Sequence, residues 1–238
     1  MKTTFSITNL LILLGLALVT LTGCQGGIVG NGKVETRNEK IGNFDKLDIS
    51  GNFHVHLEPS DKPYLRMEMD ENLYDIVKVS EEGSTLRVQT RLNILQAREK
   101  NLYIGIKDLE KMALAGAIKV EADSVLRLNS LNIEVSGAGR LNFAIEAKSL
   151  KLDLSGASEC DFRGKVDELR LQLSGAGDFD ALDLIAKDVK VDMSGAGSAR
   201  VYAKEKLNVS ISGLGTVRYR GEPEIQKNIS GLGSLKRE

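Results

Sequence analysis

The sequence predicts an all-β fold: a right-handed parallel β-helix, or solenoid, with short coils of about 18–20 residues and a more irregular β part before them. Three observations predict it. A short Gly-containing motif recurs six times at a nearly constant spacing. Apolar and polar residues alternate on both sides of each copy, which is the period of a half-buried strand. The stretches between copies are too short for a helical crossover, which excludes a βαβ fold.

The repeat is aligned on the serine that begins the tetrapeptide SGAG or a near-copy of it. Apolar residues occupy the positions five and one before this serine and five and seven after it, so each unit consists of two short strands joined by a sharp bend. Each strand is expected to pair with its copy in the next coil. The six serines are Ser136, Ser155, Ser174, Ser194, Ser212 and Ser230.

The tetrapeptide is expected to form the corner between the two strands, because glycine supplies the positive φ that a sharp corner needs. We expect its alanines to point inward and its serines to form a hydrogen-bonded ladder along the stack. Leu214 and Leu232 replace alanine in the last two copies, which predicts a tube that widens toward the C-terminus. The alanines are Ala138, Ala157, Ala176 and Ala196.

The same alignment extends upstream in weaker form. Ser50 and Ala115 take the place of the repeated serine in the segments 46–59 and 111–122. Between these segments, residues 58–109 break the period. They predict further strands, a turn and a short helical turn.

Residues 58–109 therefore belong to a more irregular N-terminal part. We expect this part to cap the same sheets, because the terminal units of a solenoid must prevent edge pairing. A single domain is expected over 41–238.

The chain begins with a segment that is typical of an export signal. A lone Lys2, an apolar run and small residues before Cys24 predict a lipoprotein signal peptide over 1–23. The closing LTGC resembles a lipobox, so Cys24 is predicted to carry lipid and to attach the protein to a membrane. The Gly-rich start of 24–40 predicts a flexible tether. We expect a lipid-anchored protein of the cell envelope, on the outer membrane, with the periplasmic or surface side left open.

Charge and cysteine content exclude several classes of function. The formal net charge is −1, with basic and acidic residues interspersed, so no nucleic-acid partner is expected. Cys160 is the one cysteine besides Cys24, so neither an internal disulfide nor a CxxC site forms in the mature chain. The sequence predicts no cofactor and no catalytic triad.

Two outward positions of neighbouring coils carry acidic residues that stack on one another. The predicted register places Glu159 and Asp161 beside Asp178 and Asp180. Nearby arginines favour a salt-bridged surface, and the alternatives are a Ca²⁺ site or the active site of a polysaccharide lyase or hydrolase.

The chain contains two histidines, His54 and His56, on one outward strand face. Two imidazoles at i and i+2 can share a metal ion, but Glu58 lies about 13 Å from His54, too far for one ion. We therefore interpret the pair as exposed histidines and predict no metal site.

Three features together resemble one known family: NFDKLDISGNFHVHLE at 43–58, the run of SGAG coils, and VRYRGEPEIQKNISGLGSLKRE at 217–238. The combination is similar to the head GIN domain family of auto-transporter adhesins, which includes many envelope lipoproteins of Bacteroidetes. The resemblance implies a right-handed β-helix on the cell envelope, no enzymatic activity, and no catalytic residues to transfer.

The preferred function is a lipid-anchored binding or structural module, adhesin-like, with a polysaccharide or a protein at the cell envelope as its ligand. The alternative is a carbohydrate-active enzyme that uses the acidic face. Ligand identity, oligomeric state and glycosylation are left open by the sequence.

Overall fold

The computed structural model describes residues 26–238. The expected signal peptide at 1–23 and the predicted lipidation site Cys24 lie outside the described residues. Within 26–238, no helix has the length and apolar character needed to cross a membrane.

The described chain is all-β, apart from one short 3-10 helix, η1 (Glu71–Leu73). The strands are β1 (Gly27–Val29), β2 (Val34–Glu39), β3 (Lys46–Pro59), β4 (Tyr64–Asp70), β5 (Val77–Glu82), β6 (Thr85–Thr90), β7 (Asn93–Gln96), β8 (Lys100–Ile106), β9 (Lys111–Glu121), β10 (Leu126–Arg127), β11 (Ser130–Leu173), β12 (Ala176–Met193), β13 (Ser198–Ile211), β14 (Thr216–Arg220), β15 (Glu224–Ile229) and β16 (Ser234–Arg237).

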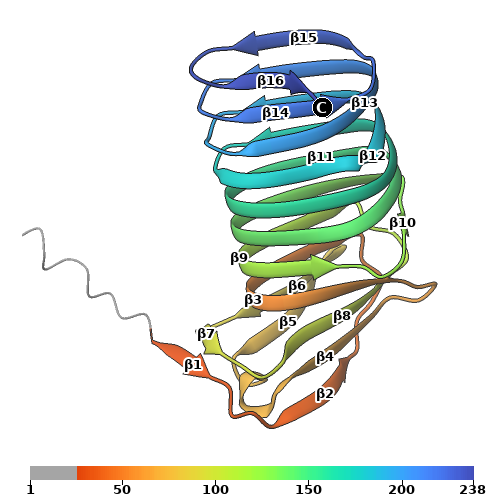
Figure 1. The fold of residues 1–238 in the computed structure, drawn as a ribbon. Helices are drawn as coiled ribbons and strands as arrows, with labels where there is room; N and C mark the ends of the chain where they lie inside the picture. The colour runs from red at the N-terminus through yellow and green to blue at the C-terminus, as the bar shows by residue number, and fades with distance from the viewer. Residues whose placement is uncertain (1–25) are drawn as a thin grey trace, which may run out of the picture.

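One large mixed sheet holds most of these strands. Its central path runs β16-β14-β13-β12-β11-β9-β3-β8-β4-β2, and the strands from β9 onward lie one above another (Figure 1). From β9 to β16 every pairing is parallel. The N-terminal part differs, because β4 pairs antiparallel with both β2 and β8, and β5 pairs antiparallel with β6.

The inward columns predicted from the repeat are buried. Cys160 pairs with Phe179, and Phe179 pairs in turn with Ala199, as the alignment predicts. Phe162 is 1% exposed; its ring lies 4.9 Å from that of Phe143 in an edge-to-face arrangement. The register shifts after Asp161, so the strict repeat is locally interrupted beside this aromatic column.

The corners differ from the sequence expectation in one respect: the alanines at the third position of the motif are exposed. Gly137 and Gly156 adopt φ of 119° and 125°, and the alternation of buried and exposed positions continues through both corners, so the alanine lies outward and the residue after it lies inward. A Cβ at Gly156 would collide with the carbonyl oxygen of Gly137, so the backbones stack too closely for a side chain. The exposed alanines are Ala138, Ala157, Ala176 and Ala196.

Two further corner predictions are corrected by the same geometry. Leu214 and Leu232 follow the alanines outward and are 64% and 84% exposed, so they do not widen an interior. At two corners the motif serine bonds to the backbone and not to another serine: the Ser155 hydroxyl donates to the carbonyl oxygen of Val135 at 3.2 Å. Ser174 makes the equivalent bond to Leu154 at 3.5 Å.

The segment expected as a flexible tether differs from that expectation where it is described. β1 pairs with β7, and β2 pairs with β4. Asp70 explains the attachment, since this fully buried carboxylate accepts hydrogen bonds from the backbone N–H groups of Gly32, Arg98 and Glu99 at 2.9, 3.2 and 3.1 Å. Burial by itself raises the pKa of Asp70, but these N–H groups outweigh it and lower the pKa.

Candidate functional site

The outward alanines form the floor of a groove across neighbouring strands. Asn52 pairs with Ala117, Ala117 with Ala138, and Ala157 with Ala176, so one small side chain follows another along the stack. The groove has a volume of about 590 Å³, and Phe53 and Ile118 add to its apolar lining. The groove is open because the side chains on its floor are small.

Charged residues line one side of the groove, two positions beyond the floor residues. Because side chains at i and i+2 share a strand face, these groups stand beside the floor. Lys100 closes the end, where its Nζ donates to Asn52 Oδ1 at 2.6 Å; burial lowers the pKa of this lysine. The charged row consists of His54, Lys119, Arg140, Glu159 and Asp178.

The acidic patch, defined as Glu159, Asp161, Asp178 and Asp180, has the register that the sequence predicts. Glu159 pairs with Asp178, and Asp161 pairs with Asp180. Each carboxylate nevertheless has its own polar partner.

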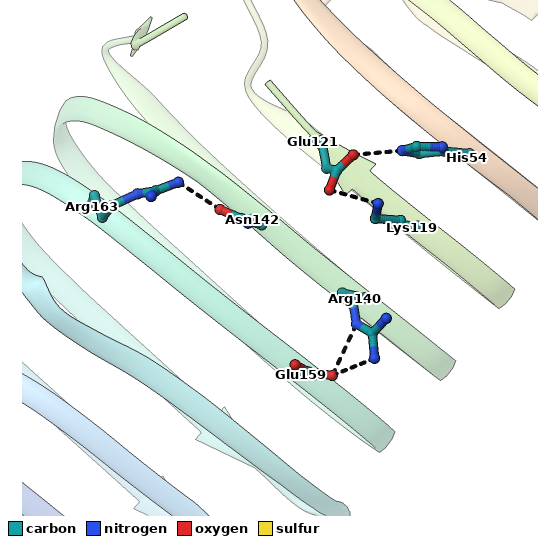
Figure 2. Close-up of polar contacts among 7 residues, drawn as sticks. All are labelled: His54, Lys119, Glu121, Arg140, Asn142, Glu159 and Arg163. Atoms are coloured by element: carbon teal, nitrogen blue, oxygen red, sulfur yellow. Dashed lines mark hydrogen bonds and ion pairs between the residues drawn. The ribbon is translucent and has the colours of Figure 1, made fainter. Parts of the chain in front are cut away.

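Arg140 Nη2 lies 2.6 Å from Glu159 Oε2 (Figure 2). Arg200 pairs with Asp180, Arg163 lies 3.9 Å from Asp161, and the Ser198 hydroxyl donates to Asp178 at 2.5 Å. The repulsion between stacked acids is therefore relieved by three arginines and by one hydroxyl.

The histidines meet a carboxylate that lies far from them in the sequence. His56 pairs with Glu121 of β9, and His54 Nε2 lies 2.7 Å from Glu121 Oε2 (Figure 2). Lys119 Nζ holds the other oxygen of Glu121 at 2.7 Å. Lys119 and then His54 lower the pKa of Glu121. Burial and the neighbouring His54 lower the pKa of His56.

Within residues 26–238, one group of three metal-ligating side chains has all its ligand atoms within 4.8 Å of one another. That group is His54, His56 and Glu121, which we call the histidine cluster. From the sequence, Glu58 was considered as the third ligand and was excluded because it lies too far from His54. The aligned segments around Ser50 and Ala115 already contained the signal, because the same offset places His56 opposite Glu121.

The cysteine inside the folded part is not a reactive site. Cys160 is a free, buried residue, and burial raises the pKa of its thiol to about 12. A thiol of this kind stays protonated near neutral pH and packs as a small apolar side chain.

The sequence matches one family model, described as "Putative auto-transporter adhesin, head GIN domain", over residues 43–223. A "putative adhesin" from Bacteroides fragilis has a similar crystal structure, with a TM-score of 0.85, 22% identity, and coverage of 89% of this chain and 100% of that chain. A "putative lipid binding protein" from Parabacteroides distasonis has a TM-score of 0.69, 28% identity, and coverage of 90% and 100%. No curated protein matches.

These similarities differ in what they establish. At 22% identity the Bacteroides fragilis structure shows a shared fold alone. The family model carries the name of an adhesin and not of an enzyme, and it matches well over half of the sequence. The chain belongs to the head GIN domain family.

Proposed function

We propose that this protein is a lipid-anchored binding module of the cell envelope, adhesin-like and without enzymatic activity, whose ligand lies along the alanine-floored groove. The observation that carries the proposal is the groove itself. It has a volume of about 590 Å³, and its apolar floor lies beside a row of charged side chains. Such a surface suits a ligand that has both apolar and polar parts.

We further propose that the scaffold is a right-handed parallel β-helix. Glu159, Asp178, Ser198 and Thr216 follow one another as parallel register partners at offsets of 18 to 20 residues, which supports one coil per offset. Parallel connections within one sheet are right-handed in about 98% of cases, which favours this hand. Groups at one motif position then form straight rows, as an extended ligand requires.

The comparisons support a binding role at the envelope. The family is named for adhesins, and the Parabacteroides distasonis relative at 28% identity is named for lipid binding. An apolar floor agrees with a ligand that has an acyl or other apolar part. Attachment through Cys24 would hold the groove near the membrane surface, where such ligands are concentrated.

The anchor is tested by Cys24→Ser in the native host. Thioether lipidation needs the sulfur, so the variant should remain an unprocessed precursor without lipid label. A normally processed, membrane-bound variant would contradict the lipoprotein prediction.

The groove is tested with Ala157→Arg, which places a long side chain on its floor. The matched control is Ala144→Arg, on the same strand and outside the groove lining. The purified proteins are incubated with neutral and acidic polysaccharides and with glycolipid vesicles, and both retention and product formation are measured.

Retention of one ligand class by the wild type and the control, but not by Ala157→Arg, is the expected result. Equal retention by all three proteins would place the ligand elsewhere. Shortened polysaccharide products would show that the protein is a carbohydrate-active enzyme instead.

A further inference from the structure

We propose that the histidine cluster, His54, His56 and Glu121, is a zinc-binding site. His54 and His56 project from the same face of β3, because residues at i and i+2 of a strand share a face. Glu121 stands opposite His56 on β9. Two imidazole nitrogens and one carboxylate oxygen form a donor set that Zn²⁺ uses in proteins, with a water molecule in the fourth position.

The distances fit a small ion after a modest adjustment. In a tetrahedral site with bonds of about 2.0–2.2 Å, ligand atoms lie about 3.3–3.6 Å apart. The three ligand atoms already lie within 4.8 Å of one another, and the His54–Glu121 contact of 2.7 Å has to open slightly. These side chains are only partly buried, so rotation of the carboxylate provides this movement without moving the backbone.

Neighbouring side chains orient two of the three ligands. Lys119 holds Oε1 of Glu121, which leaves Oε2 directed toward His54. Tyr103 stacks on His56, with ring centroids 4.6 Å apart and an angle of 12° between the planes. The Arg66 guanidinium lies 3.9 Å above the Tyr103 ring. Contacts of this type around metal ligands fix their orientation and contribute to affinity.

The charged side chains near the cluster act on a bound cation in both directions. The positive charge of Lys119 acts against a bound ion, but it is paired with Glu121. Besides Glu121, the carboxylates Asp123 and Glu58 exert an attractive field on positive charge at His56. This field lowers the energy of an ion bound between the imidazoles.

The position of the cluster leaves room for the fourth ligand. The side chains of His54 and Glu121 are 27% and 30% exposed, so water has access to the site. His54 and Lys119 also line the groove, which places the cluster at the edge of the groove. The zinc proposal does not depend on whether the groove binds a ligand, and its test uses the metal alone.

The test is calorimetric titration of Zn²⁺ into the full-length protein, purified through a tag without histidine or cysteine and treated with a chelator. We expect one zinc ion per chain. His54→Ala, His56→Ala and Glu121→Gln should each weaken binding by at least about tenfold, as the loss of a ligand or of its support does. Co²⁺ in place of Zn²⁺ should give the visible absorption of a tetrahedral site.

The matched control is Glu134→Gln. Glu134 pairs with Lys111 at 2.8 Å, much as Glu121 pairs with Lys119, but it stands apart from the histidines. This variant should bind zinc as the wild type does. Melting without metal shows that each variant folds, and zinc should raise the melting temperature of only the wild type and the control.

The proposal is overturned if the wild type binds no zinc, if the three ligand variants bind it with wild-type affinity, or if Glu134→Gln loses binding to the same extent. These outcomes are separate from those of the groove experiment. Calorimetry with zinc alone reports on the histidine cluster, and retention of polysaccharides or vesicles reports on the groove, so either proposal can fail while the other holds.

Discussion

The parallel, repeated part from β9 to β16 and the mixed part from β1 to β8 use different means to hold the chain. In the repeated part, parallel strands pair with near-copies of one another, so the same set of apolar and polar positions serves every repeat. In the mixed part, individual residues make contacts that do not recur along the chain. One example is Asp70, whose hydrogen bonds hold the segment that contains β1 and β2.

This difference indicates where distinctive chemistry arises. Repetition places similar groups beside one another, and the acidic patch shows the result, since each stacked acid needs a compensating neighbour. The histidine cluster instead joins β3 of the mixed part to β9, the first strand of the repeated part. The junction combines side chains that do not recur in the repeats, and the potential metal ligands converge there.

The largest expected effect concerns the core of the repeated part. Phe162→Ala removes a buried ring that contacts Phe143 and Phe179, so it should lower the free energy of unfolding by about 3–5 kcal/mol. Asp161→Ala, one residue earlier and outward, should cost under about 1 kcal/mol. Denaturant melts that show equal losses would contradict the inward and outward assignment.

A second prediction compares one glycine from each part. Gly156→Ala combines a φ of 125° with a collision against the Gly137 carbonyl, and should cost about 3 kcal/mol. Gly83→Ala also has positive φ, at 60°, but no atom lies within 4 Å of the new Cβ. It should therefore cost about 1 kcal/mol. Equal losses in thermal melts would show that close stacking adds nothing to the backbone strain.

The third prediction tests the attachment of the N-terminal strands. Asp70→Asn replaces a charged acceptor of three backbone N–H groups, so it should cost about 1–3 kcal/mol near neutral pH. Because the folded-state pKa of Asp70 is lowered, its contribution is present above the ordinary aspartate value of about 3.9 and is lost as the pH falls through the folded value. The wild type and the variant should thus converge in stability at low pH. A constant difference down to pH 2 would contradict this account.

Much of the fold was predictable because the repeat is explicit in the sequence. The apolar columns and the stacking of Glu159 on Asp178 follow directly from aligning the motif, and the register confirms them. The direction of the corner alanines was predicted wrongly, because the inward assignment departed from the alternation. Leu154, Ser158 and Cys160 are buried at positions of the same parity, so unbroken alternation already places Ala157 outward. The alanines form the floor of the groove, so the groove was missed together with their direction.

The histidine cluster was missed for a different reason. A search for a third ligand along the same strand is limited to residues such as Glu58, whereas the nearest carboxylate comes from another strand. The Gly-rich composition near the N-terminus likewise predicted a flexible tether. The buried carboxylate of Asp70, which holds this segment, is recognised only when its hydrogen-bond partners are known from the structure.

The smallest expected effect concerns the acidic patch and Ca²⁺. Arginines and one hydroxyl already compensate the four carboxylates, so a cation gains little by entering. Millimolar Ca²⁺ should therefore shift the melting temperature of the wild type and of Asp161→Asn/Asp178→Asn equally. A true site would stabilise the wild type by about 2.7 kcal/mol at a hundredfold excess over Kd, and the double variant would lose this gain. Such a difference would show that repetition alone can build a metal site, and the contrast with the junction at β3 and β9 would no longer hold.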